Sequence, residues 1–200
     1  MSTCTLTMES LSSPAWCESN LSGVKSLYLV PKDNVTAVNA TKAASMTTFD
    51  TFVEIGASLG ESQAVVTATG TGKGFMKLYT KKGMGELKYT MQGSGTGNHS
   101  LKATLEVFHP AAKKKIIGFL ATMMNQELIV VAGLNNGEFH LLGDLDRGAT
   151  LADGVELTSG KAVTDDSGLT LQIEWDCFLP QIFADGWDPT DATNGITIES

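Results

Sequence analysis

Short segments rich in β-branched, aromatic or alternating apolar residues, separated by glycine-bearing turns, constrain the fold of this chain more than any other feature. In Ser100–Phe108, for example, Leu101, Ala103, Leu105 and Val107 share one face, while Lys102, Thr104 and Glu106 take the other. Strands with one wet face are typical of antiparallel sheets. The predicted strands are Ser26–Val30, Thr51–Ala57, Gln63–Thr69, Phe75–Thr80, Glu86–Gln92, Ser100–Phe108, Glu127–Gly133, Glu138–Leu142 and Leu169–Cys177, with a short one at Ile196–Ile198.

The hydrophobic period changes once, after His109-Pro110. Ile116, Phe119, Leu120 and Met123 recur at helical spacing, and a proline is tolerated at the first position of a helix. The sequence therefore predicts one amphipathic helix at about residues 111–124.

The composition of two segments predicts how they connect the strands. Asn135-Asn136-Gly137 favours a hairpin turn between two predicted strands. Residues 144–168 are expected to form a long acidic, glycine-bearing loop.

Together these elements predict a mainly β protein, an antiparallel β-sandwich or barrel with one amphipathic α-helix and extended terminal arms. The length of 200 residues favours a single domain over residues 1–200. We expect residues 1–24 to form an N-terminal arm, 25–180 the sandwich core and 181–200 a C-terminal tail. Residues 31–50 are expected to be an arm or loop.

The charge of the chain restricts its partners. The net charge is −8, and Arg147 is the one arginine among 14 basic residues. Such a chain lacks the positive field and the bidentate side chains that hold phosphates, so sequence-specific nucleic-acid recognition is not expected. Residues 1–125 carry a net charge of +4 and residues 126–200 one of −12. This asymmetry indicates faces with different partners, or acids that keep loops soluble.

Neither a targeting signal nor a cysteine framework is predicted. The first twenty residues hold no lysine or arginine, and no apolar run reaches the length needed to span a bilayer. We therefore expect a protein made in a cytoplasm, not secreted and without a membrane-spanning segment. Cys4, Cys17 and Cys177 are odd in number and widely spaced, which supports neither disulfides nor a structural zinc site.

Each sequence motif that could indicate catalysis lacks neighbouring residues or elements that its chemistry requires. Ser58 sits in a G-x-S-x-G pattern, but a strand and not a helix is predicted after it. Gly72-Lys73 lacks the remaining residues of a phosphate-binding loop, and Asp144 with Asp146 lacks the later ligands of a calcium loop. A serine hydrolase at Ser58 is a third hypothesis.

Histidines and lysines give no site either. His99, His109 and His140 are not at metal-ligand spacing from one another or from a cysteine. Lys113-Lys114-Lys115 could dock an acidic partner or form a solvated face. We predict no enzyme, no cofactor and no catalytic, cofactor-binding or metal-binding residue.

The order of elements resembles a known family. An arm, an antiparallel sandwich, one helix between strands and a long internal loop are similar to the major tail tube proteins of tailed bacteriophages. The segment from Gly133 through Leu142-Gly143-Asp144 and Arg147-Gly148-Ala149 to Leu169–Trp175 resembles, more loosely, tube or related virion proteins. The resemblance implies a virion tail protein whose copies form hexameric, stacked rings, contact other tail proteins and let DNA pass through the lumen during ejection. Residues 1–24 and 31–50 would be the arms between subunits.

On this interpretation, the acidic C-terminal part helps line the DNA channel, and Asp144, Asp165, Asp166 and Glu174 are the candidate lining residues. A tail terminator, an adaptor ring and a capsid decoration protein remain alternatives, since they can share the fold. A different class, a carbohydrate-binding or receptor-binding β-sandwich, is suggested by Trp175, Trp187 and the glycine-rich loops.

Overall fold

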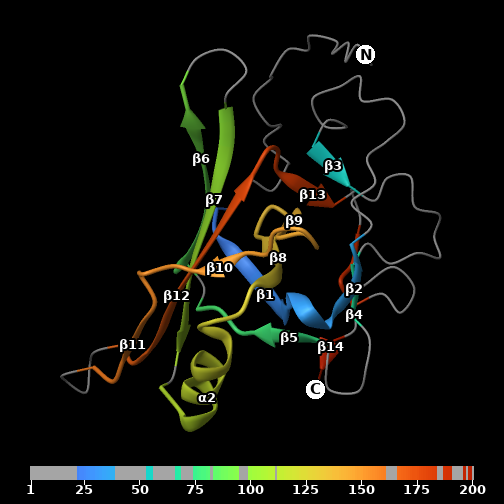
Figure 1. The fold of residues 1–200 in the computed structure, drawn as a ribbon. Coiled ribbons are helices and arrows are strands. Elements are labelled where there is room, and N and C mark those ends of the chain that lie inside the picture. Colours follow the sequence, from blue (N-terminus) through green and yellow to red (C-terminus); the bar gives the residue numbers. More distant parts are fainter. Residues whose placement is uncertain are drawn as a thin grey trace, which may run out of the picture.

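Two β-sheets packed face to face form the body of the molecule in the computed structural model (Figure 1). The structure describes residues 22–38, 53–55, 66–68, 74–81, 83–94, 99–110, 112–160, 166–183, 187–190, 196 and 198–199. Within them the fold is mainly β, with antiparallel sheets and one α-helix of described extent, α2 (Lys114–Met123). The predicted fold class is confirmed, in its sandwich form.

The larger sheet has seven strands with β1, β8 and β9 at its centre. Its order is β14 (Ile198–Glu199), β5 (Phe75–Leu78), β1 (Val24–Pro31), β8 (Leu128–Leu134), β9 (Phe139–Leu142), β13 (Gln181–Phe183) and β3 (Glu54–Ile55). Pairing is antiparallel except for the short β13–β3 and β14–β5 contacts, which are parallel. The hairpin between β8 and β9 is confirmed, and Gly137 supplies the positive φ of 102° that its turn requires.

The second sheet has five strands, and its outer face is exposed to solvent. Its order is β10 (Thr150–Leu151), β12 (Gly168–Cys177), β7 (His99–Pro110) and β6 (Gly85–Gly93), and β11 (Glu156–Thr158) also pairs with β12. Along β7, residues Ala103, Leu105 and Val107 are fully buried, whereas Glu106 is exposed. The alternation predicted from the sequence is present.

Two apolar cores lie on opposite faces of the seven-stranded sheet. One fills the space between the two sheets and includes Leu27, Leu142 and Leu105. The other lies on the far face and includes Tyr28, Leu141 and the side chains of a small sheet formed by β2 (Val35–Val38) and β4 (Val66–Ala68). The central strands are therefore covered on both faces, which explains the nearly continuous apolar sequence of β8.

The helix begins later than predicted. Pro110 is the last residue of β7 and pairs with Gly168, and Lys113 has the extended conformation of an N-cap, so α2 starts at Lys114 and not near residue 111. Its side chains Ile116, Phe119, Leu120 and Met123 pack on the core between the sheets, as their spacing predicts. The β ladder continues through the proline because that residue lies at the end of the strand.

Three segments expected to be irregular contain short strands. Residues 31–50 include the 3-10 turn η1 (Lys32–Asn34) and β2, residues 144–168 include β10 and β11, and the tail contributes β13 besides β14. Strands of two to four residues are too short to show a period, and their partners are distant in sequence. Residues 1–21 and 39–50 lie outside the described residues, so most of the predicted arms is not described. No helix in the described part of the chain is long and apolar enough to cross a membrane.

Candidate functional site

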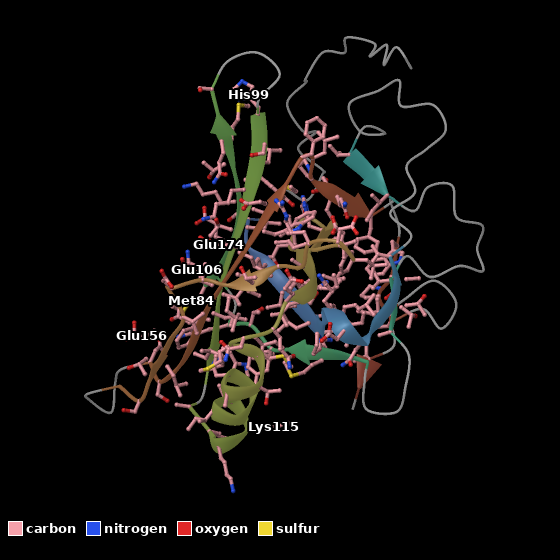
Figure 2. All side chains as sticks on the ribbon, viewed as in Figure 1. Met84, His99, Glu106, Lys115, Glu156 and Glu174 are labelled. Atoms are coloured by element: carbon pink, nitrogen blue, oxygen red, sulfur yellow. The ribbon has the colours of Figure 1, made fainter. Side chains whose placement is uncertain are left out.

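The outer face of the five-stranded sheet is a polar surface built by β6, β7 and β12. Its members, identified by alternation and register, face away from the core between the sheets, and Figure 2 labels Glu106 and Glu174 among them. They are Glu86, Lys88 and Thr90 on β6, Lys102, Thr104 and Glu106 on β7, and Thr170, Gln172, Glu174 and Asp176 on β12. Four carboxylates and two lysines give this outer face a net charge of −2, and it holds no arginine.

Two glutamates on this outer face oppose each other directly. Glu86 on β6 and Glu106 on β7 are paired in register, and both are exposed. Side chains paired in this way have Cβ atoms about 4.5–5.5 Å apart, and like charges at that position destabilise a sheet. The arrangement is unfavourable for folding, so folding does not explain it.

Ion pairs join the two oppositely charged parts of the sequence. Lys102 Nζ lies 2.7 Å from Glu174 Oε2, and Lys81 Nζ lies 2.6 Å from Asp166 Oδ2. Lys32 also pairs with Glu127. The hydrogen bond that Lys102 donates to Glu174 raises the pKa of Lys102, and the hydrogen bond that Lys32 donates to Glu127 lowers the pKa of Glu127. Each pair links a lysine of residues 1–125 to an acid of residues 126–200, so part of the charge asymmetry is neutralised inside the fold.

The four predicted lining acids are not brought together. Asp144 caps a turn, where its carboxylate accepts hydrogen bonds from the backbone N–H groups of Asp146 (2.9 Å) and Arg147 (2.6 Å). Asp166 is held by Lys81, and Asp165 lies outside the described residues. Glu174 alone is on the outer face of the five-stranded sheet, where its neighbours include Glu106 and Asp176.

A polar cluster of Tyr89, His140 and Cys177 lies at the other face of this sheet. The Tyr89 hydroxyl is 2.9 Å from His140 Nδ1, and His140 Nε2 is buried without a hydrogen-bond partner among the described residues. Burial lowers the pKa of His140 against the opposing effect of Glu138, whose Oε2 is 3.7 Å away. Burial also raises the pKa of Tyr89 far above its usual value and that of Cys177 to about 11. Neutral, enclosed groups of this kind connect the sheets and offer no activated nucleophile.

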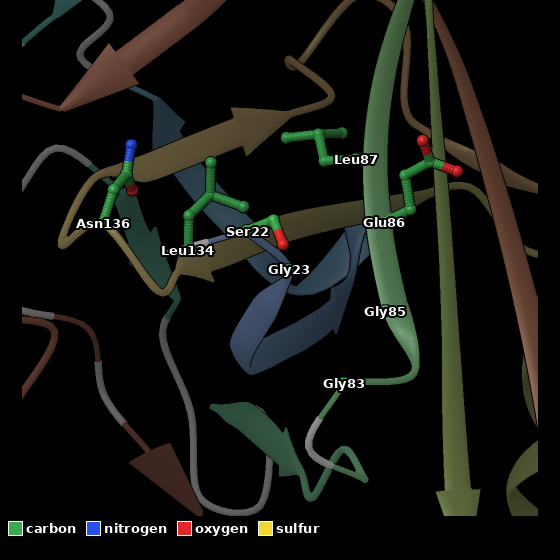
Figure 3. Close-up of a pocket in the computed structure, with 8 residues that line it drawn as sticks. All are labelled: Ser22, Gly23, Gly83, Gly85, Glu86, Leu87, Leu134 and Asn136. Atoms are coloured by element: carbon green, nitrogen blue, oxygen red, sulfur yellow. The ribbon is translucent and has the colours of Figure 1, made fainter. Parts of the chain in front are cut away.

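One cavity is lined by few chemically reactive groups. It measures about 470 Å³ and lies between the start of β6, the residues ahead of β1 and the β8–β9 turn (Figure 3). Leu87 and Leu134 are its apolar members, and the Glu86 side chain points away from the others in the close-up. Glycine backbone, Ser22 and the Asn136 amide complete the lining, so no acid–base pair is assembled there.

A second cavity, which we name the Phe178 groove, lies at the end of β12. It measures about 370 Å³, and it is lined by Asp144, Asp146, Arg147, Trp175, Asp176, Cys177, Phe178, Leu179 and Gln181. The Trp175 Nε1–H donates to the Arg147 carbonyl oxygen (3.1 Å) and fixes the β9–β10 loop against the strand. The Phe178 side chain is 76% exposed.

The remaining candidate residues are dispersed. Ser58 and Gly72-Lys73 lie outside the described residues. His109 Nδ1 lies 2.8 Å from the Tyr79 carbonyl oxygen. His99 is exposed, and it is distant from His140 in the sequence. Within the described ranges, no three histidine, cysteine, aspartate or glutamate residues form a metal-binding group.

Both tryptophans suggested as a sugar platform contact other parts of the fold. Trp175 is 3% exposed and belongs to the core between the sheets. Trp187 stacks on Phe183 at a centroid distance of 3.9 Å and meets Phe139 edge-on at 5.1 Å. Both rings are thus engaged by the fold.

Together, sheets, helix and surface define a β-sandwich with a polar, arginine-free outer sheet face and, among the described residues, no metal-binding group. Comparison of the chain with protein-family models, curated proteins and solved structures finds no match.

Proposed function

We propose that this chain is a structural subunit of a tailed-bacteriophage virion, a tail tube protein whose copies form stacked, hexameric rings around a channel for DNA. The observation that carries the proposal is the outer face of the five-stranded sheet, with Glu86 opposed to Glu106 and no arginine. A channel wall has to let phosphates slide past, and a net acidic surface without bidentate side chains meets that requirement. The role is structural and needs neither a cofactor nor catalysis.

The edge strand β6 supports the assembly part of the proposal. It is nine residues long, and β7 is its one strand partner within the described ranges. An unpaired strand edge offers a row of N–H and C=O groups to another chain. Continuation of the five-stranded sheet across this edge would join neighbouring subunits in a ring and carry the acidic face around the lumen.

Electron microscopy of the purified full chain tests the proposal. We expect long hollow tubes. Isolated rings would instead indicate a tail terminator or adaptor ring, and particles that remain monomeric at all concentrations would contradict a tube.

A charge-reversal variant tests the lining. Glu86→Lys combined with Glu106→Lys should produce tubes that retain DNA, with an affinity that decreases as salt increases, while tubes of the unaltered chain retain none. Asp33→Lys combined with Asp153→Lys is the matched control, because it makes the same change in charge at exposed turns. Equal DNA retention by both variants would show that the outer face of this sheet does not line the channel.

A further inference from the structure

The charged residues at the N-terminus of α2 are electrostatically unfavourable there. Lys113, Lys114 and Lys115 are all exposed there, the first turn holds no acidic residue, and the N-cap makes no side-chain hydrogen bond. The amino end of a helix carries a partial positive charge, so lysines at this position are unfavourable. An external acidic partner would remove that cost.

The helix also has a second apolar stripe that the fold does not cover. Ile117 is 53% exposed and Met124 is 59% exposed, and with Ala121 they recur at helical spacing on the solvent side. Lys113 and Lys114 lie at the amino end of the same stripe. We refer to these five residues as the α2 stripe, a surface that combines apolar contacts with positive charge.

The Phe178 groove has the complementary composition. Its carboxylates, from Asp144, Asp146 and Asp176, exceed the single positive charge of Arg147, and the highly exposed Phe178 ring lies among them. Gln181 Oε1, in the groove lining, is buried without a hydrogen-bond donor among the described residues. The groove therefore offers acidic groups and an aromatic ring.

The α2 stripe and the Phe178 groove lie toward opposite ends of the five-stranded sheet. Pro110, shortly before α2, pairs with Gly168 at one end of β12, while Trp175 and Cys177 lie at the other end, where Cys177 pairs with Leu101. At about 3.3 Å per residue, the two ends of β12 are roughly 30 Å apart. Figure 1 shows α2 beside the lower end of this sheet and the β12–β13 junction at its upper end. One copy cannot satisfy its own groove across this distance, whereas a second copy placed along the strand direction can.

We infer that the α2 stripe of one copy docks into the Phe178 groove of the next copy, so that the chain assembles head to tail. The occupant is a second copy because this chain itself supplies the lysine-rich, apolar surface that the groove complements. A helix is about 10–12 Å across, so the groove accepts side chains of the α2 stripe and not the whole helix. The contact is heterologous and repeats without limit unless a ring closes it. The inference deepens the proposed function. It rests on that function, because only a tube of stacked rings places this contact between one ring and the next.

A charge swap tests this contact. Sedimentation of the full chain measures assembly in three variants: the helix variant Lys113→Glu/Lys114→Glu, the groove variant Asp146→Lys/Asp176→Lys, and a variant carrying all four changes. We expect each two-site variant to lose assembly, with an association constant reduced at least about tenfold, and the four-site variant to regain it. Asp144 is left unchanged because its carboxylate caps the loop.

Matched controls and the outcomes separate the two proposals. Lys25→Glu/Lys77→Glu reverses two exposed lysines outside α2 and outside the five-stranded sheet and should leave assembly unchanged. Tubes formed equally well by all variants would overturn the docking contact and leave the tube proposal standing. Helical or cyclic assemblies without a lumen that show the charge-swap rescue would support the contact and contradict the tube. A chain that never self-associates, or a four-site variant that folds but does not regain assembly, would overturn the contact.

Discussion

The two sheets of this molecule differ in how many of their faces are buried. In β9 of the seven-stranded sheet, the adjacent residues Leu141 and Leu142 are both 0% exposed, and they belong to different cores. In β7 of the five-stranded sheet, Leu105 is fully buried, but its neighbours Thr104 and Glu106 lie on the outer face. Both faces of the seven-stranded sheet are thus packed at its centre, whereas the outer face of the five-stranded sheet is available for contacts with other molecules.

The largest expected effect is a difference between the two sheets in how alanine substitutions change the free energy of unfolding. Leu141→Ala and Leu142→Ala should each lower the free energy of unfolding by about 2–5 kcal/mol, because each empties a filled core. In β7, Leu105→Ala should cost a similar amount, while Thr104→Ala should change stability by less than about 1 kcal/mol. Chemical denaturation measures all four variants.

A small change in the free energy of unfolding for either β9 substitution would contradict this prediction. If Leu141→Ala were as mild as Thr104→Ala, the far face of the seven-stranded sheet would not be a core. The slope of the denaturation curve serves as a control, since a change in it would show that a substitution altered the compactness of a state and not only its stability.

The second prediction concerns the inner face of the five-stranded sheet. In a Cys4→Ser/Cys17→Ser background, the thiol of Cys177 should react with an alkylating reagent at about pH 8 at least ~100-fold more slowly in the folded than in the unfolded chain. Its pKa is raised from 9.0 to about 11, so the thiolate fraction falls roughly tenfold per unit. Burial of the side chain slows the reaction further.

Mass spectrometry over time measures the alkylation. A rate equal to that of the unfolded chain would mean that this end of the inner face is open to water. Trp175→Phe is a useful comparison, because it removes the Nε1–H bond to the Arg147 carbonyl and loosens the loop near the thiol. We expect alkylation of Cys177 to become faster in this variant.

Long strands could be predicted from sequence because their periodicity is local. The segments Glu86–Gln92, Ser100–Phe108 and Leu169–Cys177 correspond closely to β6, β7 and β12. By contrast, β10, β11 and β13 have two or three residues each, and pairing with β12 or β9, not periodicity, defines them. Such pairing depends on contacts between distant parts of the sequence, which no local pattern contains.

The acidic surface was only partly predictable for the same reason. Glu174 was identified from its place in the acidic C-terminal part, but Glu86 and Glu106 lie in the net positive part and meet only through the β6–β7 register. Alternation could have found them, since both occupy polar positions of predicted strands. The same alternation places Trp175 with Leu171 and Ile173 on the buried face, which argues against its use as an exposed platform.

The third prediction tests the polar contact between the two sheets. Burial lowers the folded-state pKa of His140 below its ordinary value of 6.5, so below that pH the unfolded chain binds more protons than the folded one. Stability should therefore fall as the pH decreases through about 6.5, and His140→Gln should reduce this loss. The glutamine can still bond to the Tyr89 hydroxyl, so packing is largely kept.

Thermal unfolding between about pH 7.5 and pH 5.5 measures the difference. Glu138→Gln is the second variant, because it removes the carboxylate that favours protonated His140 and should make the loss of stability on acidification steeper. Identical pH profiles for the unaltered chain and His140→Gln would show that His140 does not control the acid response.

The smallest expected effect lies on the outer face of the five-stranded sheet and separates folding from function most directly. Glu106→Gln should stabilise the protein by about 0.2–1 kcal/mol, because it removes a like charge directly opposite Glu86. The gain should disappear in a Glu86→Gln background and should shrink at high salt, where exposed charges are screened. A gain that is the same in both backgrounds would mean that the two carboxylates do not interact. If the stabilised variant forms tubes that hold DNA more firmly than the unaltered chain, then the repulsion that weakens the sheet is the property that the channel requires.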